Sequence, residues 1–342
     1  SFRDEWREYA RIAGAPGDLV SLANRFDPDR ALGHIETLAS PQFAGRQAGA
    51  PGADLAADYV AGQFAALGLQ PLGDPLTPTA AMTETVALGY LQRFPISYTR
   101  LISVPALTLL DGDGSVLYSF TYRDEFVESS AVDSERGAGA GVARGELVWV
   151  HAEDLEGMQF GRAVVIEQDV PDPVSRAAQL RDHGAGGLIV VTDKESKYLQ
   201  AGHVRPSQGA GTAIPVFEIT RAAFENLLTR LGIERQDLLF APPALPLGVE
   251  VRHSLVYSPI TTTLTANVVG LWPGVDPNLK KEVLIVAAHY DHIGRSPDGL
   301  YFPGANRNAS GVAALLEMAR VWRENGYRPA RSVLFVAWGG EE

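Results

Sequence analysis

Four residues whose types can bind a metal ion and move a proton stand at two places in the sequence. His289 and Asp291 are two positions apart, and Glu341 and Glu342 are adjacent. A neutral imidazole and carboxylates suit a divalent metal such as zinc, and a carboxylate two residues past a histidine can orient its ring. Of two adjacent glutamates, one can bind the metal while the other takes a proton from the metal's water. A single His-x-Asp at a strand end is more often only a polar pair, so a site requires that the fold bring both places together.

Two apolar runs predict the strands that position these residues. Residues 283–288 read VLIVAA and lead into His289, and residues 332–338 read SVLFVAW and lead into the glutamate pair. Uninterrupted runs of this kind are typical of strands buried on both faces of a largely parallel sheet. Between them the sequence predicts a helix that begins after Asn308 and ends at Asn325. This βαβ unit places the polar residues at the carboxyl ends of both strands, the edge where open α/β sheets bind ligands.

Three motifs in this region resemble the co-catalytic zinc aminopeptidases of the M28 family. They are AHYDH at 288–292, PGANRNASG at 303–311 and FVAWGGEE at 335–342, and they follow the family's order and spacing. The resemblance implies an α/β fold of the zinc exopeptidase type, with a mixed, largely parallel central sheet flanked by helices. It also implies zinc as the cofactor, with two ions in the family, and a peptide as the substrate.

The resemblance assigns a role to each candidate residue. It implies that His289 and Glu342 are zinc ligands, that Asp291 is the partner of His289, and that Glu341 is the general base. One position departs from the pattern, because the family has an aspartate that bridges both metals where this chain has Arg307. An arginine replaces that negative charge by a permanent positive one, so we expect one zinc ion or none. A guanidinium that points inward is expected to pair with Glu341 or Glu342.

The character of the sequence changes in the middle of the chain. Short β-type runs separated by glycine-rich turns replace the long apolar strands, and residues 176–191 and 214–219 resemble the protease-associated (PA) domain often inserted into these enzymes. We therefore predict a β-rich, PA-like inserted domain over residues 98–257. Residues 1–97 and 258–342 are predicted to form one discontinuous zinc peptidase domain. The family's remaining aspartate and histidine ligands come after the glutamate pair, so this domain is expected to be C-terminally incomplete.

A turn-rich loop in the N-terminal part, FAGRQAGAPG at residues 43–52, also resembles the N-terminal segment of the family. It leads into a helix whose apolar face runs over residues 56–67 and which Gly68 ends. For Arg46, within this loop, a solvated surface charge is favoured over a contact with substrate.

Composition sets limits on the partners of the protein. The chain has 342 residues, of which 46% are hydrophobic and 20% charged, values ordinary for a globular protein with room for two domains. A net charge of −12 disfavours nucleic acid and anionic membranes as partners. No apolar run is long enough to span a bilayer, and the absence of cysteine excludes disulfides and thiolate metal sites. The family resemblance implies export to the periplasm or the extracellular space.

Two functions from different classes follow from these features. The first is a zinc-dependent exopeptidase, an aminopeptidase that removes N-terminal residues from peptides through a zinc-bound hydroxide, impaired here by Arg307 and by the missing C-terminal part. The alternative is a non-catalytic binding protein, or pseudopeptidase, on the same scaffold, as the transferrin receptors are in this superfamily. The four retained site residues favour the first function, and Arg307 favours the second.

Overall fold

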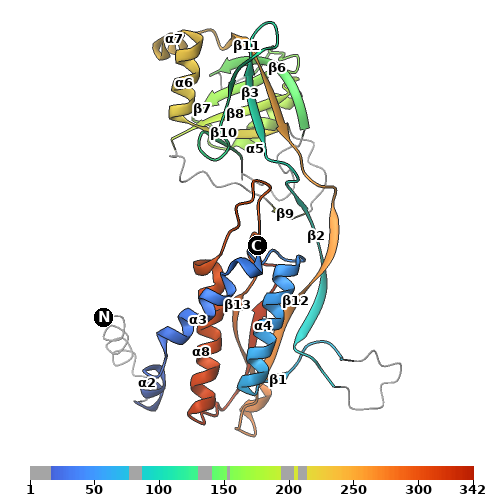
Figure 1. Cartoon of the computed structure of the whole chain (residues 1–342), viewed down its shortest axis with the longest axis vertical. Coiled ribbons are helices and arrows are strands. Elements are labelled where there is room, and N and C mark those ends of the chain that lie inside the picture. Colours follow the sequence, from blue (N-terminus) through green and yellow to red (C-terminus); the bar gives the residue numbers. More distant parts are fainter. Residues whose placement is uncertain (1–16, 77–86, 130–140, 152–154, 194–203, 207–213) are drawn as a thin grey trace. The chain divides into compact units, whose positions relative to one another are not determined.

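A computed structural model describes residues 17–76, 87–129, 141–151, 155–193, 204–206 and 214–342 of the chain. The chain divides into two compact units (Figure 1). The first comprises Ser1–Ile96, Thr262–Arg295 and Gly299–Glu342, and the second comprises Ser97–Thr261 and Ser296–Asp298. The candidate site residues therefore all belong to the first unit. No helix in the described part of the chain combines the length and the apolar character that crossing a membrane requires.

The first unit contains long helices whose ends follow local sequence signals. Its described helices are α2 (Gly17–Ala23), α3 (Pro28–Leu38), α4 (Pro51–Leu67) and α8 (Ser310–Glu324), with the short segments η1 (Pro41–Phe43), η3 (Leu279–Lys281) and η4 (Ala305–Ala309). Asp27 caps α3, because its side chain accepts hydrogen bonds from two backbone N–H groups of the first turn. Gly68 ends α4 in the left-handed conformation, at φ 76°. Both α4 and its glycine stop are as the sequence predicts.

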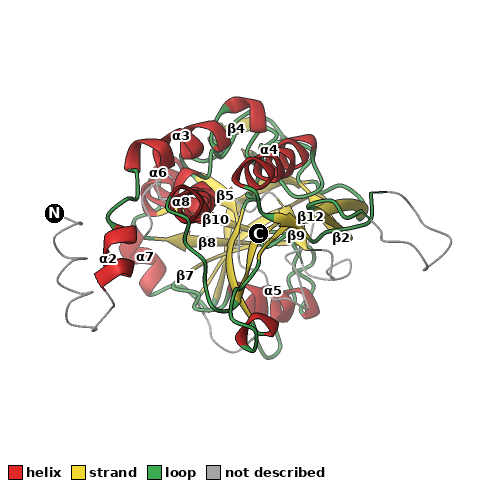
Figure 2. Cartoon of the chain, turned by 90° about the horizontal axis from the view of Figure 1, so that it is seen from below, coloured by secondary structure: helices red, strands yellow, loops and turns green. Residues whose placement is uncertain are grey.

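The sheet of the first unit is mixed. Its strands are β13 (Val283–His289), β14 (Ser332–Trp338), β12 (Thr261–Trp272) and β2 (Leu91–Arg100), in that order, with β1 (Gln70–Pro71) against β12. The end of β2, from Tyr98 to Arg100, belongs to the second unit and pairs there with β9 (Val204–Pro206). β13 and β14 are parallel, whereas β12 runs antiparallel to β14 and to β1. The helices α3, α4 and α8 lie together on one face of this sheet (Figures 1 and 2). The predicted α/β class, with a mixed sheet flanked by helices, is confirmed. The expectation that this sheet is largely parallel is not met in the described residues, where β13 and β14 are parallel and β12 pairs antiparallel with β14 and β1.

The core of this unit forms where α4 and α8 pack on the sheet. Phe64 on α4, Leu316 on α8 and Phe335 on β14 are fully buried members of one hydrophobic cluster. The amphipathic stripe of α8 is thereby removed from water, which is the main source of stability for a helix of this length. The packing fixes α8 and the segment that precedes it against the ends of β13 and β14.

The prediction that residues 283–288 are buried on both faces is wrong. The strand forms as predicted, but Val283, Leu284 and Ile285 are 52%, 55% and 59% exposed. These side chains are exposed because β13 lies at the edge of the described sheet and has a neighbouring strand, β14, on one side only. An apolar strand edge of this kind is a site for association with further polypeptide.

The segment before α8 bends sharply. Residues Ala305–Ala309 form a distorted turn in which Arg307 and Asn308 have non-helical dihedral angles, and the peptide bond between these two residues is cis. The Asn308 side chain accepts a hydrogen bond from the backbone N–H of Gly311 at 3.0 Å, which caps the start of α8. The helix start predicted at Asn308 is therefore correct.

The second unit is built on one eight-stranded sheet. Its strand order is β4 (Val116–Ser119), β3 (Ala106–Leu110), β11 (Ala244–Leu255), β6 (Gly141–Val150), β7 (Val164–Gln168), β8 (Gly187–Thr192), β10 (Val216–Thr220) and β5 (Phe126–Glu128). The middle strands β6, β7, β8 and β10 are parallel, and the flanking pairs are antiparallel.

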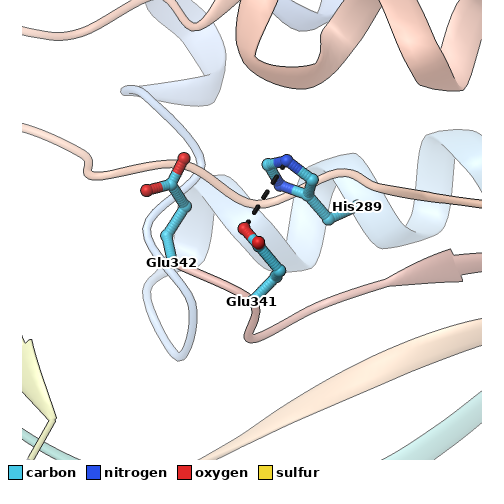
Figure 3. Close-up of side chains that lie close together, drawn as sticks. All are labelled: His289, Glu341 and Glu342. Atoms are coloured by element: carbon cyan, nitrogen blue, oxygen red, sulfur yellow. Dashed lines mark ion pairs between the residues drawn. The ribbon is translucent and has the colours of Figure 1, made fainter.

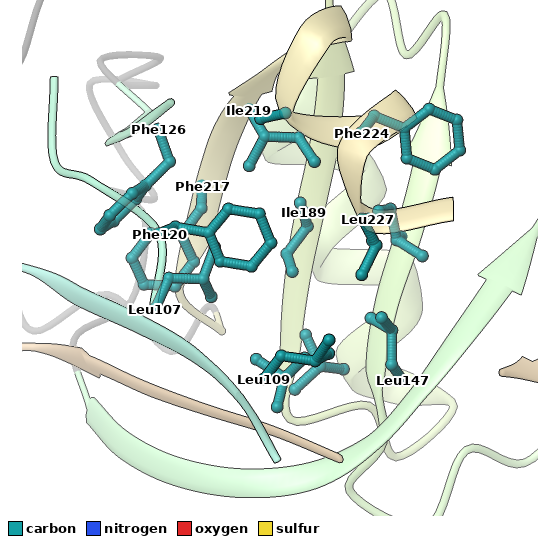
Figure 4. Close-up of a cluster of buried hydrophobic side chains, with 14 of the residues drawn as sticks. Leu107, Leu109, Phe120, Phe126, Leu147, Ile189, Phe217, Ile219, Phe224 and Leu227 are labelled. Carbon is teal, nitrogen blue, oxygen red and sulfur yellow. The ribbon is translucent and has the colours of Figure 1, made fainter. Parts of the chain in front are cut away.

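Helices and a separate hydrophobic core complete the second unit. The helices are α5 (Pro173–Asp182), α6 (Arg221–Leu231) and α7 (Arg235–Leu239). Asp172 caps α5 and Thr220 caps α6, because each side chain accepts a hydrogen bond from a backbone N–H of the first turn. Phe217 and Phe224 belong to the apolar cluster between α6 and the sheet (Figure 4). Because this core is independent of the first one, the unit has its own source of stability.

Candidate functional site

The carboxyl ends of β13 and β14 bring three of the predicted residues together. The parallel register pairs His289 with Trp338, so Glu341 and Glu342 follow just past the end of the neighbouring strand. The Nε2 atom of His289 lies 3.6 Å from a carboxylate oxygen of Glu341. One ligand atom of each of His289, Glu341 and Glu342 lies within 4.8 Å of those of the other two. Figure 3 shows the imidazole ring facing the Glu341 carboxylate, with Glu342 beside it.

Asp291 connects the segments that follow β13 and β14 through hydrogen bonds. Its side chain is fully buried, and its Oδ2 atom accepts hydrogen bonds from the backbone N–H groups of Glu341 at 2.9 Å and Glu342 at 3.2 Å. Its Oδ1 atom lies 3.5 Å from Nδ1 of His289, and that nitrogen is also 3.2 Å from the Asp291 carbonyl oxygen. Burial raises the pKa of Asp291, opposed by backbone N–H groups and by the charge of His289.

This contact fixes how the histidine can act. The N–H at Nδ1 of His289 can donate a hydrogen bond to the backbone carbonyl oxygen of Asp291, which leaves the lone pair of Nε2 on the side of Glu341. The second oxygen of Asp291, Oδ1, is buried and has no hydrogen-bond partner within the described residues. Asp291 therefore lies where a carboxylate would orient a metal-binding imidazole.

His292 is a site residue that the sequence reasoning missed. Its Nδ1 atom lies 3.1 Å from Oε1 of Glu342, and burial lowers the pKa of His292, opposed by the nearby Glu342 carboxylate. Nothing in the spacing of His292 alone distinguishes it from a surface histidine. The available signal was its place at the end of the same motif, one residue after Asp291.

Arg307 reaches the same carboxylate from the bend before α8. Its Nε atom lies 3.2 Å from Oε1 of Glu342, while 71% of the Arg307 side chain stays exposed. Glu342 is thus approached by both His292 and Arg307, and Glu341 lies on the side of His289. The sequence leads us to expect this pairing for a guanidinium that points inward, whereas the Arg307 side chain pairs with Glu342 while largely exposed.

The prediction that Arg46 is a solvated loop charge is wrong. Its side chain is fully buried, and the guanidinium donates hydrogen bonds to backbone carbonyl groups. Burial lowers the pKa of Arg46 to about 10, opposed by the charge of Asp291. Four carbonyl oxygens replace the water that a surface arginine would bind, which is why so polar a group is stable in the interior.

These residues fit one zinc ion. An imidazole nitrogen and carboxylate oxygens within a few ångströms of one another form a donor set that zinc accepts, and Asp291 supplies the outer partner of the histidine. At position 307 the side chain is a guanidinium, which has no lone pair to offer a metal.

Comparison with known proteins identifies the C-terminal segment of this sequence. Residues 267–342 match the model of Peptidase family M28. Those residues belong to peptidase family M28. The M28 segment contains the second half of β12 and all of β13, α8 and β14, together with His289, Asp291, Glu341 and Glu342. The family resemblance of the three motifs is therefore confirmed.

Two curated relatives extend the similarity beyond the M28 segment. An aminopeptidase of Pseudomonas aeruginosa (strain UCBPP-PA14) is 27% identical over 316 residues, which cover 92% of this chain and 51% of that protein. Transferrin receptor protein 2 of Mus musculus is 25% identical over 283 residues, which cover 68% of this chain and 33% of the receptor. The chain spans about half the length of the first relative and a third of the second.

A solved structure shares the fold. The zinc aminopeptidase BSAP of Bacillus subtilis superposes with a TM-score of 0.58 at 21% sequence identity, over 93% of this chain and 62% of that one. The chain is thus similar in sequence both to an aminopeptidase and to a transferrin receptor.

Proposed function

We propose that this protein is a zinc aminopeptidase of the M28 type. The observation that carries the proposal is the convergence of His289, Glu341 and Glu342 at the ends of two parallel strands, with Asp291 buried behind the histidine. The similarity to the P. aeruginosa aminopeptidase and to the B. subtilis zinc aminopeptidase supports it. The substrate class is a peptide with a free N-terminus.

Each residue has a distinct part in this proposal. His289 and Glu342 hold zinc, and Asp291 keeps the imidazole in the tautomer whose Nε2 can bind the metal. When bound, zinc supplies a Lewis acid that polarises the carbonyl group and lowers the pKa of water. Glu341 takes the proton from the attacking water and passes it to the leaving amine, which is the work of a general base and then a general acid.

Arg307 weakens this site. Its guanidinium pairs with the carboxylate of Glu342 that the proposal assigns to zinc, and it contributes a positive charge where the family has a bridging aspartate. A cation that competes for a metal ligand lowers metal affinity, and position 307 gives a second ion no carboxylate. We therefore expect one zinc ion at most in this protein, and weak hydrolysis.

A second candidate function is a non-catalytic binding protein on the same scaffold. The ion pair between Arg307 and Glu342 favours it, because it fills part of the metal site with a side chain. The similarity to the mouse transferrin receptor protein 2 supports it as well. The two candidates differ in whether zinc binds and whether a peptide bond is broken.

We also propose which domain each of the two compact units is. The first unit is proposed to be the zinc peptidase domain, and the second to be a PA-like domain inserted into it, with boundaries near the predicted ones. Export from the cytoplasm is proposed on the family resemblance.

The test measures zinc content and hydrolysis of an aminoacyl p-nitroanilide by the full-length protein. We expect up to one zinc ion per chain, hydrolysis that depends on it, and loss of hydrolysis by about 10²- to 10⁴-fold in Glu341→Gln with zinc content unchanged. Failure of the native protein and of Arg307→Asp to bind zinc would instead support the non-catalytic alternative.

A further inference from the structure

The largest charged group in the interior of the first unit is the guanidinium of Arg46. It lies in the loop between η1 and α4 and is fully buried. Its donors reach four backbone carbonyl oxygens at 2.5 to 2.9 Å, those of Leu38, Tyr290, Pro303 and Gly304. A planar fork with five N–H donors can hold several acceptors at fixed angles, which the single ammonium of lysine cannot do.

Three of these four carbonyl groups belong to the two segments that carry the candidate site. Tyr290 stands between His289 and Asp291 in the chain. Pro303 and Gly304 stand directly before the bend that carries Arg307. One side chain thus joins the segment after β13 to the segment before α8 through backbone carbonyl groups of both. The Glu342 carboxylate also contacts both segments, through the side chains of His292 and Arg307.

The backbone of the same loop strengthens this link. The carbonyl oxygen of Arg46 accepts a hydrogen bond from the N–H of His292 at 3.1 Å, and that of Gly45 accepts one from Gly294 at 3.1 Å. Asp291 is therefore flanked by two bonds to Arg46, one through the Tyr290 carbonyl and one through the His292 N–H.

Close packing leaves this arrangement little freedom. Gly304 has φ 57°, and a Cβ atom added there would lie 2.6 Å from Nη2 of Arg46 and 2.6 Å from the ring of His292. A side chain at position 304 would displace the guanidinium or the imidazole. The glycine therefore lets the turn approach the arginine closely enough for a hydrogen bond to its carbonyl.

The guanidinium does not act through an ion pair. Within the described residues no carboxylate lies at salt-bridge distance from Arg46, although Arg307 and Arg320 both have such partners. Removing a charged guanidinium from water costs free energy, and here peptide carbonyl groups offset that cost. The carbonyl groups must therefore stay in place around the guanidinium.

We propose that Arg46 is the positioning residue of the metal site. Its guanidinium sets the separation of the segments that hold His289 and Asp291 on one side and position 307 on the other, and it touches neither zinc nor substrate. This role rests on the proposed function, since it assigns a task toward zinc. Loosening of the segment after β13, which follows His289 and holds Asp291, lowers the affinity for zinc without removing a ligand.

The test compares Arg46→Lys with the matched control Arg320→Lys in the full-length protein. Arg320 is also a largely buried arginine of this unit, but it pairs with Glu317 and donates to the Arg25 carbonyl, away from the site segments. The first measurement is amide hydrogen exchange of the metal-free protein over residues 289–294 and 301–309. We expect exchange in both segments to rise by about 10-fold or more in Arg46→Lys and to stay native in Arg320→Lys.

The second measurement is the dissociation constant for Zn²⁺ alone, from competition with a chelating dye. We expect it to rise by about 10- to 100-fold in Arg46→Lys and to be unchanged in Arg320→Lys. If the native protein takes up no zinc, the proposed function fails, whereas the exchange measurement still decides whether Arg46 positions the two segments.

Three results would overturn the positioning role. The first is native exchange in either segment of Arg46→Lys, and the second is native zinc affinity in that variant. The third is loss of cooperative unfolding in both Arg46→Lys and Arg46→Gln, because Arg46 would then support the whole unit rather than the two segments.

Discussion

Arg307 and Glu342 form an ion pair in which Nε of the arginine lies 3.2 Å from Oε1 of the glutamate. The same oxygen lies 3.1 Å from Nδ1 of His292, so the glutamate assigned to zinc already has two nitrogen partners. A metal ion must compete with both for this carboxylate. The ion pair between Arg307 and Glu342 therefore separates the two proposed functions, because zinc binding requires that the pair be broken.

Arg307→Asp is predicted to raise zinc affinity and hydrolysis. The change removes the cation from Glu342 and supplies a carboxylate at the bridging position, so we expect zinc content to increase toward two ions per chain. Metal analysis and hydrolysis of an aminoacyl p-nitroanilide check this. Arg331→Asp is the control, because Arg331 is an arginine of the same unit paired with Glu282. Equal gains in both variants would contradict the role given to position 307.

Asp291→Asn is predicted to weaken zinc binding. The amide oxygen can still accept the hydrogen bonds from the backbone N–H groups of Glu341 and Glu342, but the side chain loses its negative charge, 3.5 Å from Nδ1 of His289. We expect the zinc dissociation constant to rise by about 10- to 100-fold. Asp276→Asn is a matched control, since Asp276 also accepts two backbone hydrogen bonds, from Asn278 and Leu279. If Asp291→Asn binds zinc as tightly as the native protein, Asp291 has no role in the metal site.

The stability of the second unit is predicted to fall in mild acid because of His253. This histidine is almost completely buried on β11, and burial lowers its pKa. The folded state then keeps the ring neutral while the unfolded state takes up a proton as the pH falls through about 6.5. Stability is present in full above that pH and is lost below it, by at most about 1.4 kcal/mol per pH unit.

His253→Leu checks this pH dependence. Leucine occupies the same apolar surroundings, near Phe217, and cannot bind a proton. Calorimetric unfolding at pH 7.5, 6.0 and 5.0 should show a smaller acid loss in the variant than in the native protein. The prediction is wrong if both proteins lose the same stability between these pH values.

The apolar edge of β13 is predicted to make the 1–342 chain self-associate. Ile285 is 59% exposed there, and unpaired strand edges with apolar side chains template further pairing. Ile285→Lys should reduce the associated fraction in sedimentation velocity. Leu264→Lys is the control, because Leu264 is 57% exposed but lies on β12, an interior strand. An equal effect of both substitutions would point to general surface hydrophobicity instead.

The elements that carry the site could be predicted from the sequence because their signals are local. Apolar runs specify β13 and β14, and the side chain of Asn308 caps α8 within a few residues of itself. The ends of two parallel neighbouring strands must meet at one edge, so the convergence of His289 with Glu341 follows from the βαβ pattern. The motifs also placed this segment in its family.

The tertiary structure decided the features that depend on residues far apart in the chain. Arg46 meets Tyr290 across 244 positions, and no local pattern distinguishes a guanidinium held by carbonyl groups from one in water. The contact of His292 with Glu342 spans 50 positions, and the exposure of β13 depends on which strands surround it. Sequence determined which side chains could do the chemistry, because residue type and strand ends are local properties. Packing decided which atoms they face, because burial and hydrogen-bond partners are properties of the whole fold.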